Sequence, residues 1–280
     1  MEAPADAPVM ETATPTVRGD GSGPTVAWLH GYTMDSRVWG QVWRQLPAFR
    51  HLGIDLPGHG SSPALPVDAP IGRWAETVER VMAAHGCRML VAMCMGTMVA
   101  AEVAIRARIP LDALVLVAPA LVGMPQDPAT ARRFASVAIR AMRGAPREEL
   151  VRLWLQPPAA IFAGVARNPE GYAVLCEAIA AHRWPNLRAG GPAAFRTGEQ
   201  TLADLAAGSA ARTLVLSGSE DLAEQRALAH AMADRLPGCT MVEFPGLGHL
   251  PPLEEPRIVT PVIVDFLRAA TVPTPGAAAP

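Results

Sequence analysis

An apolar run enters a helical pattern at Leu90-Val91-Ala92-Met93-Cys94-Met95-Gly96-Thr97. The continuous apolar character of residues 88–93 predicts a buried strand, and the residues that follow predict a helix. Ala92 and Gly96 lie two positions before and after Cys94. Small residues at this spacing are typical of a strained strand-to-helix turn that presents a nucleophile, because the helix must pack closely against the strand. Cys94 is therefore a candidate nucleophile.

Two interpretations of Cys94 are open from this segment alone. At the start of a helix, unpaired N–H groups and the helix dipole favour a reactive thiolate. Most free cysteines, however, are small buried apolar side chains with no chemical role. The rest of the chain has to decide between these interpretations.

Short apolar runs alternate with helical patterns on both sides of this turn. Strands are expected at residues 25–29, 51–55, 114–117, 213–216 and 240–244, and helices at 37–46, 71–85, 222–236 and 256–269. Strands separated by helices pair in parallel, which predicts an α/β fold with an open, mostly parallel sheet and helices on both faces. Residues 121–210 break the alternation and predict a helical insertion.

The composition excludes several classes of protein. Half of the residues are hydrophobic and 18% are charged, which excludes a disordered chain, and a net charge of -2 gives no reason to expect nucleic acid as a partner. The N-terminus is acidic and rich in proline, unlike a signal peptide, and no apolar run has the roughly 18–20 residues needed to span a bilayer. Four scattered cysteines favour a reduced, cytoplasmic protein: Cys87, Cys94, Cys176 and Cys239.

Polar motifs follow four of the predicted strands. They are His30-Gly31-Tyr32, then Asp55-Leu56-Pro57-Gly58-His59-Gly60-Ser61, Gly218-Ser219-Glu220-Asp221 and Gly246-Leu247-Gly248-His249, the last trailed by Pro251, Glu254 and Pro256. In this order, with the turn at Cys94, they resemble the α/β-hydrolase fold superfamily, and within it the branch of esterases, thioesterases and haloperoxidase-like enzymes that carry a cap. The resemblance covers residues 24–267.

The resemblance implies a role for each matching position. Cys94 would be the nucleophile, His249 the general base, and Asp221 the acid that orients the imidazole. The backbone N–H groups of Tyr32 and Met95 would form the oxyanion hole. Along the chain, the candidate nucleophile, acid and histidine follow one another in the order that is typical of the family.

Other residues compete for some of these roles. Glu220 is the alternative acid, although Asp221 fits the family spacing better. His59 lies in a loop that is structural in this family. Neither cofactor nor metal is expected, because the sequence has no Gly-rich phosphate loop after a strand and no cluster of metal ligands.

The same resemblance implies a division of the chain. The core would comprise residues 17–121 and 211–270, the helical cap residues 122–210, and the disordered tails residues 1–16 and 271–280. The substrate pocket would lie under the cap, and its expected lining residues are Tyr32, Trp154 and Phe162. Further cap side chains expected there are Phe134, Met142, Leu153 and Tyr172.

A cysteine at the position of the usual serine suggests the type of substrate. Exchange between a thiol and a thioester is nearly isoenergetic, whereas attack of a thiol on an unactivated ester is harder, because the thiolate is the better leaving group and the tetrahedral adduct collapses back. The residues therefore favour a small acyl substrate, free or bound to a carrier protein, and an esterase-like or thioesterase-like enzyme of secondary metabolism. Two alternatives are a lyase that uses His249 as its base and a binding protein without catalysis.

Several arginines of the insertion bear on the carrier. Arg132, Arg133, Arg140, Arg143 and Arg147 would suit an anionic ligand such as a phosphopantetheine arm. A solvated, arginine-rich helix face explains the same pattern.

Overall fold

The computed structural model describes residues 16–18, 23–156, 160–189, 195, 198–209 and 211–271. Residues 1–15 and 272–280, most of the two predicted disordered tails, lie outside these ranges. Thr16 begins strand β1 (Thr16–Arg18) and Thr271 ends helix α11 (Pro256–Thr271), so the predicted tails extend slightly too far into the chain. None of the described helices has both the length and the apolar character needed to cross a membrane.

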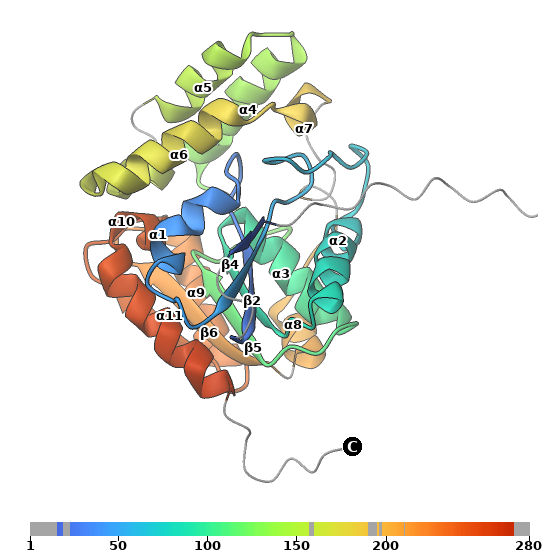
Figure 1. Cartoon of the computed structure of the whole chain (residues 1–280). Coiled ribbons are helices and arrows are strands. Elements are labelled where there is room, and N and C mark those ends of the chain that lie inside the picture. Colours follow the sequence, from blue (N-terminus) through green and yellow to red (C-terminus); the bar gives the residue numbers. More distant parts are fainter. Residues whose placement is uncertain are drawn as a thin grey trace, which may run out of the picture.

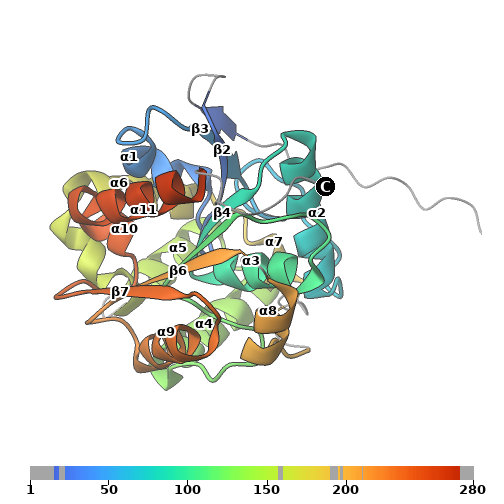
Figure 2. The same ribbon diagram turned by 90° about the horizontal axis from the view of Figure 1, so that it is seen from below.

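One seven-stranded sheet has the order β1-β3-β2-β4-β5-β6-β7. After β1, its strands are β2 (Thr25–Leu29), β3 (Arg50–Ile54), β4 (Met89–Met93), β5 (Ala113–Val117), β6 (Arg212–Gly218) and β7 (Thr240–Phe244). The strands from β3 to β7 pair in parallel, whereas β1 lies antiparallel on β3 at the edge. Figure 2 shows the succession from β3 through β2, β4 and β6 to β7. The predicted α/β fold is confirmed, and the short β1 was not predicted.

Strand β4 shows why the sheet is covered on both faces. All five of its residues are buried, and their side chains alternate between two apolar clusters. Met89, Val91 and Met93 belong to one cluster, and Leu90 and Ala92 to the other. A strand in the middle of the sheet therefore needs an unbroken apolar run, which is the pattern seen in the sequence.

Helices cover each face. On one face lie α2 (Ile71–Ala84), α3 (Met95–Arg106), α8 (Leu202–Gly208) and α9 (Ala223–Arg235), and on the other lie η1 (Ser36–Trp39), α1 (Gly40–Trp43), α10 (Pro251–Glu254) and α11. Although α8 falls within the interval predicted to be the cap, it packs on α3: a Cβ at Gly208 would lie 2.6 Å from the Cα of Ile105. The predicted cap interval thus includes one helix that covers the sheet.

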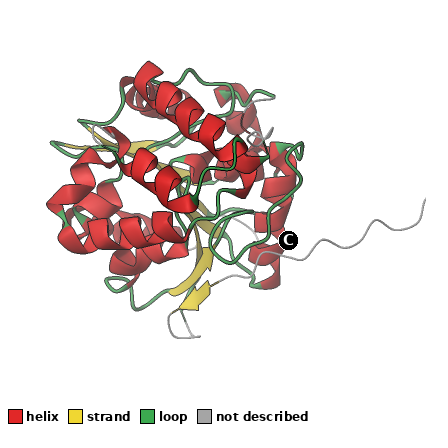
Figure 3. Cartoon of the chain, turned by 90° about the horizontal axis from the view of Figure 1, so that it is seen from above, coloured by secondary structure: helices red, strands yellow, loops and turns green. Residues whose placement is uncertain are grey.

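The remaining helices of the insertion, which lie between β5 and β6 in the sequence, form a separate layer. They are α4 (Pro128–Met142), α5 (Arg147–Leu155), η2 (Ala160–Arg167), α6 (Pro169–Ala181) and α7 (Pro185–Arg188), and we call them the cap helices. They lie above the sheet in Figure 1, and Figure 3 looks down on the molecule from that side.

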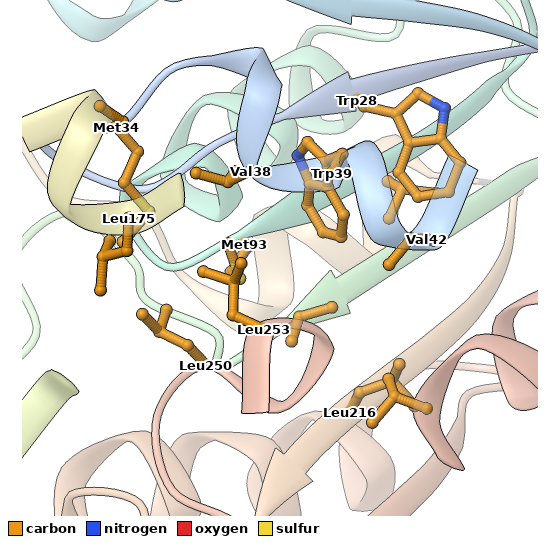
Figure 4. Close-up of a cluster of buried hydrophobic side chains, with 14 of the residues drawn as sticks. Trp28, Met34, Val38, Trp39, Val42, Met93, Leu175, Leu216, Leu250 and Leu253 are labelled. Atoms are coloured by element: carbon orange, nitrogen blue, oxygen red, sulfur yellow. The ribbon is translucent and has the colours of Figure 1, made fainter. Parts of the chain in front are cut away.

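The cap helices share an apolar cluster with the layer beneath them. Leu175 of α6 lies in the same buried cluster as Met34, Leu250 and Leu253, which come from loops and α10 below (Figure 4). Trp28 and Trp39 extend this cluster toward the sheet, with ring centroids 5.0 Å apart. The cap helices are therefore packed against the core through buried side chains.

Candidate active site

A cavity of about 450 Å³ lies between the loops that follow the central strands and cap helix α4. Its lining is mostly apolar. The lining residues include Tyr32, Cys94, Met95, Met98, Ala120, Gln126, Asp127, Thr130, Phe134, Ala135, Ala138, Ile139, Met142, Trp154, Ile161, Leu187, Phe195, Leu222, Gln225 and His249. The structure therefore brings Tyr32, Cys94, Met95, Trp154 and His249, all expected site residues, to one cavity.

Cys94 occupies the turn between β4 and α3. Its backbone has φ +54° and ψ -124°, a left-handed conformation that costs a non-glycine residue about 1–3 kcal/mol. Its N–H donates to the carbonyl of Val117 at 2.9 Å, which ties the turn to the end of β5. A Cβ at Gly96 would lie 2.7 Å from the carbonyl oxygen of His30, so a side chain there would push α3 away. The turn has the form that the spacing of Ala92, Cys94 and Gly96 predicts.

His249 and Asp221 come from the loops after β7 and β6. The imidazole Nδ1 lies 2.7 Å from Oδ1 of Asp221, and both side chains are buried. Oδ1 of Asp221 also accepts the N–H of Leu222 at 2.7 Å. Glu220 instead has a side chain that is 58% exposed and pairs with Arg167 at 2.9 Å. The geometry therefore favours Asp221 over Glu220 as the partner of the imidazole.

Cys94 and His249 affect each other's protonation. Burial alone would raise the pKa of the Cys94 thiol, but the charge of His249 and its hydrogen bond, with the N–H of Met95, outweigh burial and lower that pKa. Burial alone would lower the pKa of His249, but Asp221 and Cys94 hold it well above its ordinary value. Both directions favour a thiolate beside an imidazolium, which is the reactive form of a cysteine nucleophile.

The two backbone N–H groups expected to form an oxyanion hole belong to Tyr32 and Met95. The Met95 N–H, in the first turn of α3, interacts with the sulfur of Cys94. Tyr32 follows β2, and its N–H donates to none of the described residues. Gly31 brings this loop to the cysteine, since a Cβ at Gly31 would lie 3.2 Å from the Cβ of Cys94. The loop that holds Tyr32 and the first turn of α3 therefore both lie beside Cys94.

Aromatic rings from the cap and the core form one wall of the cavity. The ring of Tyr32 lies 5.3 Å from that of Phe134 and 5.8 Å from that of Trp154. The indole Nε1 of Trp154 donates to Oγ1 of Thr33 at 2.8 Å, a bond between α5 and the loop after β2. Phe134, Met142 and Trp154 of the expected cap residues line the cavity.

The prediction that Phe162 lines the pocket is wrong. Phe162 is buried and packs behind Trp154, with ring centroids 6.0 Å apart, and it does not line the cavity. Leu153 and Tyr172 are likewise absent from the lining. Sequence alone could not separate these residues from Trp154, because an apolar residue of an inserted helix can face the cavity, the sheet or another cap helix.

The structure adds residues that the sequence did not single out. Gln225, in the first turn of α9, lines the cavity beside Leu222, and its buried Oε1 has no partner among the described residues. Its position one helical turn after Asp221 is the only signal in the sequence. His51 is buried, and so is His182 at the C-terminal end of α6, where its ring stacks on that of His59 with centroids 4.7 Å apart. In the described part of the chain, no group of three or more His, Cys, Asp or Glu side chains is arranged to hold a metal ion.

Comparisons with known proteins agree with the fold of the chain. A model of the alpha/beta hydrolase family matches residues 26–261. A segment of 65 residues is 40% identical to a 2-succinyl-6-hydroxy-2,4-cyclohexadiene-1-carboxylate synthase of Salmonella paratyphi C (strain RKS4594), and it spans 23% of this chain and 24% of that protein. The structure of a thermophilic esterase from Thermogutta terrifontis is similar with a TM-score of 0.73 and 27% identity, over 92% of this chain and 94% of its own. MenH from S. aureus has a TM-score of 0.77 and 20% identity, over 94% of this chain and 100% of its own.

Proposed function

The chain belongs to the alpha/beta hydrolase family, and from this premise we propose that it is an acyl-transfer hydrolase that acts through a covalent acyl-Cys94 intermediate. One observation carries the proposal. Cys94 shares a hydrogen bond with His249, which lies 2.7 Å from Asp221, and the sulfur opens into an apolar cavity. A protein that only bound a ligand would gain nothing from an oriented imidazole at this place.

The first half of the reaction would acylate the cysteine. The thiolate of Cys94 attacks the carbonyl carbon of a thioester or activated ester, and the charge that develops on the carbonyl oxygen is stabilised by the N–H groups of Tyr32 and Met95. The tetrahedral adduct collapses and the carbon–sulfur or carbon–oxygen bond of the leaving group breaks. His249 donates its proton to that leaving group, and the acyl group remains on Cys94.

The second half would release the acyl group. Neutral His249 takes a proton from water, or from an alcohol or amine acceptor, as the oxygen or nitrogen attacks the acyl carbon. The bond to Cys94 breaks, the thiolate re-forms and the imidazole retains the proton. Asp221 stabilises the imidazolium in both halves and fixes the tautomer of the ring.

The chemistry of the thiol favours thioesters and activated esters over simple esters. With a simple ester, the thiolate of Cys94 is the better leaving group, so the tetrahedral adduct returns to reactants. With a thioester the two sulfur leaving groups are similar, and the reaction can proceed in either direction. The mostly apolar lining of the cavity suits an apolar acyl chain.

Residues beside the cavity support a substrate held on an anionic carrier. Ile139 and Met142 line the cavity and are 45% and 52% exposed, which places the mouth of the cavity at the end of α4. Ile139 also borders a depression lined by Arg140 and Arg143. Arg140 pairs with Glu149, while Arg143 has no acidic partner among the described residues. A phosphopantetheine arm entering the cavity could place its phosphate against Arg143.

A lyase is the second candidate, favoured by the similarity to the synthases and to MenH. In such a reaction His249 would remove a proton and Cys94 would only position the substrate. The product named for those synthases carries a succinyl group and a carboxylate. The described lining of this cavity includes no arginine, so it offers no guanidinium to bind such groups. We therefore place acyl transfer first.

Intact-mass spectrometry tests the proposal. The wild-type protein is exposed to a panel of acyl thioesters, activated esters and lactones, with Cys94→Ala as the matched control. We expect the mass to increase by one acyl group in the wild type alone, with the adduct mapped to Cys94. Each thioester is offered on pantetheine and on phosphopantetheine, which isolates the contribution of the phosphate.

The other outcomes separate the candidates. Product without an adduct, retained in Cys94→Ala and lost in His249→Ala, would support the lyase. Neither product nor adduct over the whole panel would contradict the acyl-transfer proposal.

A further inference from the structure

Glu254 holds the backbone on both sides of His249. Its side chain is 1% exposed, and Oε2 accepts the N–H of Gly248 at 2.7 Å while Oε1 accepts the N–H of Leu250 at 3.0 Å. These two N–H groups belong to the residues that flank His249 in the chain. One carboxylate therefore bridges the residues immediately before and after the base.

The partners of Glu254 show which task it can perform. No described Arg or His side chain forms an ion pair with it, so neutralising a cation is not its role. Both of its oxygens bond backbone N–H groups of the His249 loop. The N–H of Glu254 donates to the carbonyl of Leu250 at 3.0 Å, which closes the same turn from the other end. Three hydrogen bonds that involve Glu254 therefore fix the loop around His249.

The cap confines this carboxylate from the outside. Gly164 of η2 points directly at it, since a Cβ on Gly164 would overlap both oxygens of Glu254. Asn168, at the start of α6, donates through Nδ2 to the carbonyl of Leu253 at 2.8 Å. Gly248 approaches from the inside, where a Cβ would lie 3.0 Å from Oε1. Two glycines thus leave room for the carboxylate and no more.

We infer that Glu254 is a positioning residue that keeps the His249 imidazole in line with Cys94 and Asp221, and that the cap segment at Gly164 keeps Glu254 in place. The inference rests on the proposed function, in which His249 is the base. Without the carboxylate, two buried N–H groups would lack an acceptor, which is costly in a folded protein. The loop would then relax toward other acceptors or water, and the ring would lose its alignment.

The pH dependence of Cys94 alkylation tests this without any acyl substrate. Because His249 lowers the pKa of the thiol, a displaced imidazole would let that pKa rise, and alkylation by iodoacetamide would need a higher pH. We expect this shift in Glu254→Gln, which loses one acceptor, and a larger one in Glu254→Ala. Gly164→Ala should shift it in the same direction, because the new Cβ displaces the carboxylate.

Matched controls come from the same chain. Glu255→Gln changes the neighbouring carboxylate, which makes no side-chain hydrogen bond to a described residue. Gly40→Ala adds a Cβ at a glycine with nothing within 4 Å. Both should alkylate as the wild type does. For any acyl substrate that the wild type turns over, Glu254→Gln should lower kcat about ten- to a hundredfold while KM changes little, as expected for a misaligned base.

The outcomes are decisive in each direction. Thermal unfolding identifies the variants that fold, and Glu254→Gln and Gly164→Ala carry the test if Glu254→Ala does not. Folded variants with a lower melting temperature but the alkylation midpoint and kcat of the wild type would show a merely structural role and overturn the inference. A shifted midpoint in a protein that forms no acyl adduct would instead contradict the proposed function and leave the positioning role of Glu254 standing.

Discussion

At Cys94 two unfavourable features coincide in one residue. The backbone adopts a left-handed conformation without being glycine, and the ionisable thiol is largely enclosed. The first is maintained by the bond to Val117 and the close packing at Gly96. The second is offset by His249 and the N–H of Met95. The neighbours of Cys94 thus impose the conformation that directs its sulfur into the cavity.

Replacing the sulfur of Cys94 by oxygen, in Cys94→Ser, tests whether the reaction uses a thiol. We expect Cys94→Ser to lower kcat/KM for thioesters about a hundredfold or more, because a hydroxyl stays protonated where the thiol ionises and depends fully on a base. The measurement is steady-state turnover of a thioester and an activated ester. Cys87→Ser is the control, since the Cys87 thiol is buried and burial raises its pKa to about 11. A serine variant as fast as the wild type on thioesters would argue against the thiol mechanism.

The two neighbouring acids should behave differently. Asp221→Asn removes the charge that stabilises protonated His249, so kcat should fall by about a thousandfold or more. Glu220→Gln breaks only an exposed pair with Arg167, so kcat should stay within about twofold of the wild type. Both variants are assayed with the same substrate and checked for folding. The reverse ranking would move the acid to Glu220.

At the scale of elements, the loops after the strands hold the residues of the proposed mechanism, and helices of the insertion line the cavity. Residues 30–32, 94–95, 221–222 and 249 all follow strand ends and meet at one edge of the sheet. This convergence is a property of parallel sheets, and it explains why motifs far apart in sequence could be assigned to one site. No such rule predicts which cap side chains point into the cavity, because their direction depends on how the helices of the insertion pack together.

Substitutions of Phe134 and Phe162 can distinguish a side chain that contacts substrate from one that only packs in the interior. Phe134 lines the cavity, so Phe134→Ala should raise KM for long acyl chains about tenfold and change it little for acetyl groups. Phe162 is buried behind Trp154, so Phe162→Ala should cost about 3–5 kcal/mol of unfolding free energy and leave chain-length preference unchanged. Turnover of an acyl series and thermal unfolding of both variants provide the comparison. Equal effects on preference would mean that Phe162 also contacts substrate.

The sequence predicted much of the sheet and the order of the motifs, and physical reasons explain what it missed. Buried parallel strands have a local apolar signature, so β4 and β5 could be recognised from five residues each. Strand β1 has three residues and exists through its pairing with β3, which no local pattern encodes. Helix α8 lies in the insertion by sequence but on the sheet by packing. The role proposed for Glu254 depends on where its carboxylate meets the His249 loop, and that requires coordinates.

At the scale of the whole molecule, four buried histidines link stability to pH. Burial lowers the pKa of His30, His51 and His59, and lowers that of His182 to about 3. In the unfolded chain these side chains would take up protons at their ordinary pKa. Stability should therefore fall as the pH drops below about 6.5, because the unfolded state then binds more protons than the folded state. His249 acts in the opposite sense, since its pKa is raised on folding.

Thermal unfolding between pH 8 and pH 5 (values chosen to bracket about 6.5, the ordinary histidine pKa) measures this balance. We expect the melting temperature to fall toward the acid end. His182→Phe should flatten the dependence by removing one of the four groups, while His230→Phe, an exposed control, should not. A melting temperature that rises toward acid pH would mean that the raised pKa of His249 outweighs the lowered pKa values of the four buried histidines.

The bond between Trp154 and Thr33 gives the protein an intrinsic optical reporter. All six tryptophans are buried, but among the described residues that line the cavity Trp154 is the one tryptophan, and its indole N–H donates to the loop after β2. The polarity around an indole sets its emission wavelength, so an acyl chain that displaces water from the cavity should shift the emission of Trp154 to the blue. The other five indoles contribute a background that the difference from Trp154→Phe removes. Ligand entry can thus be followed in real time by fluorescence, without a label and before any substrate has been identified.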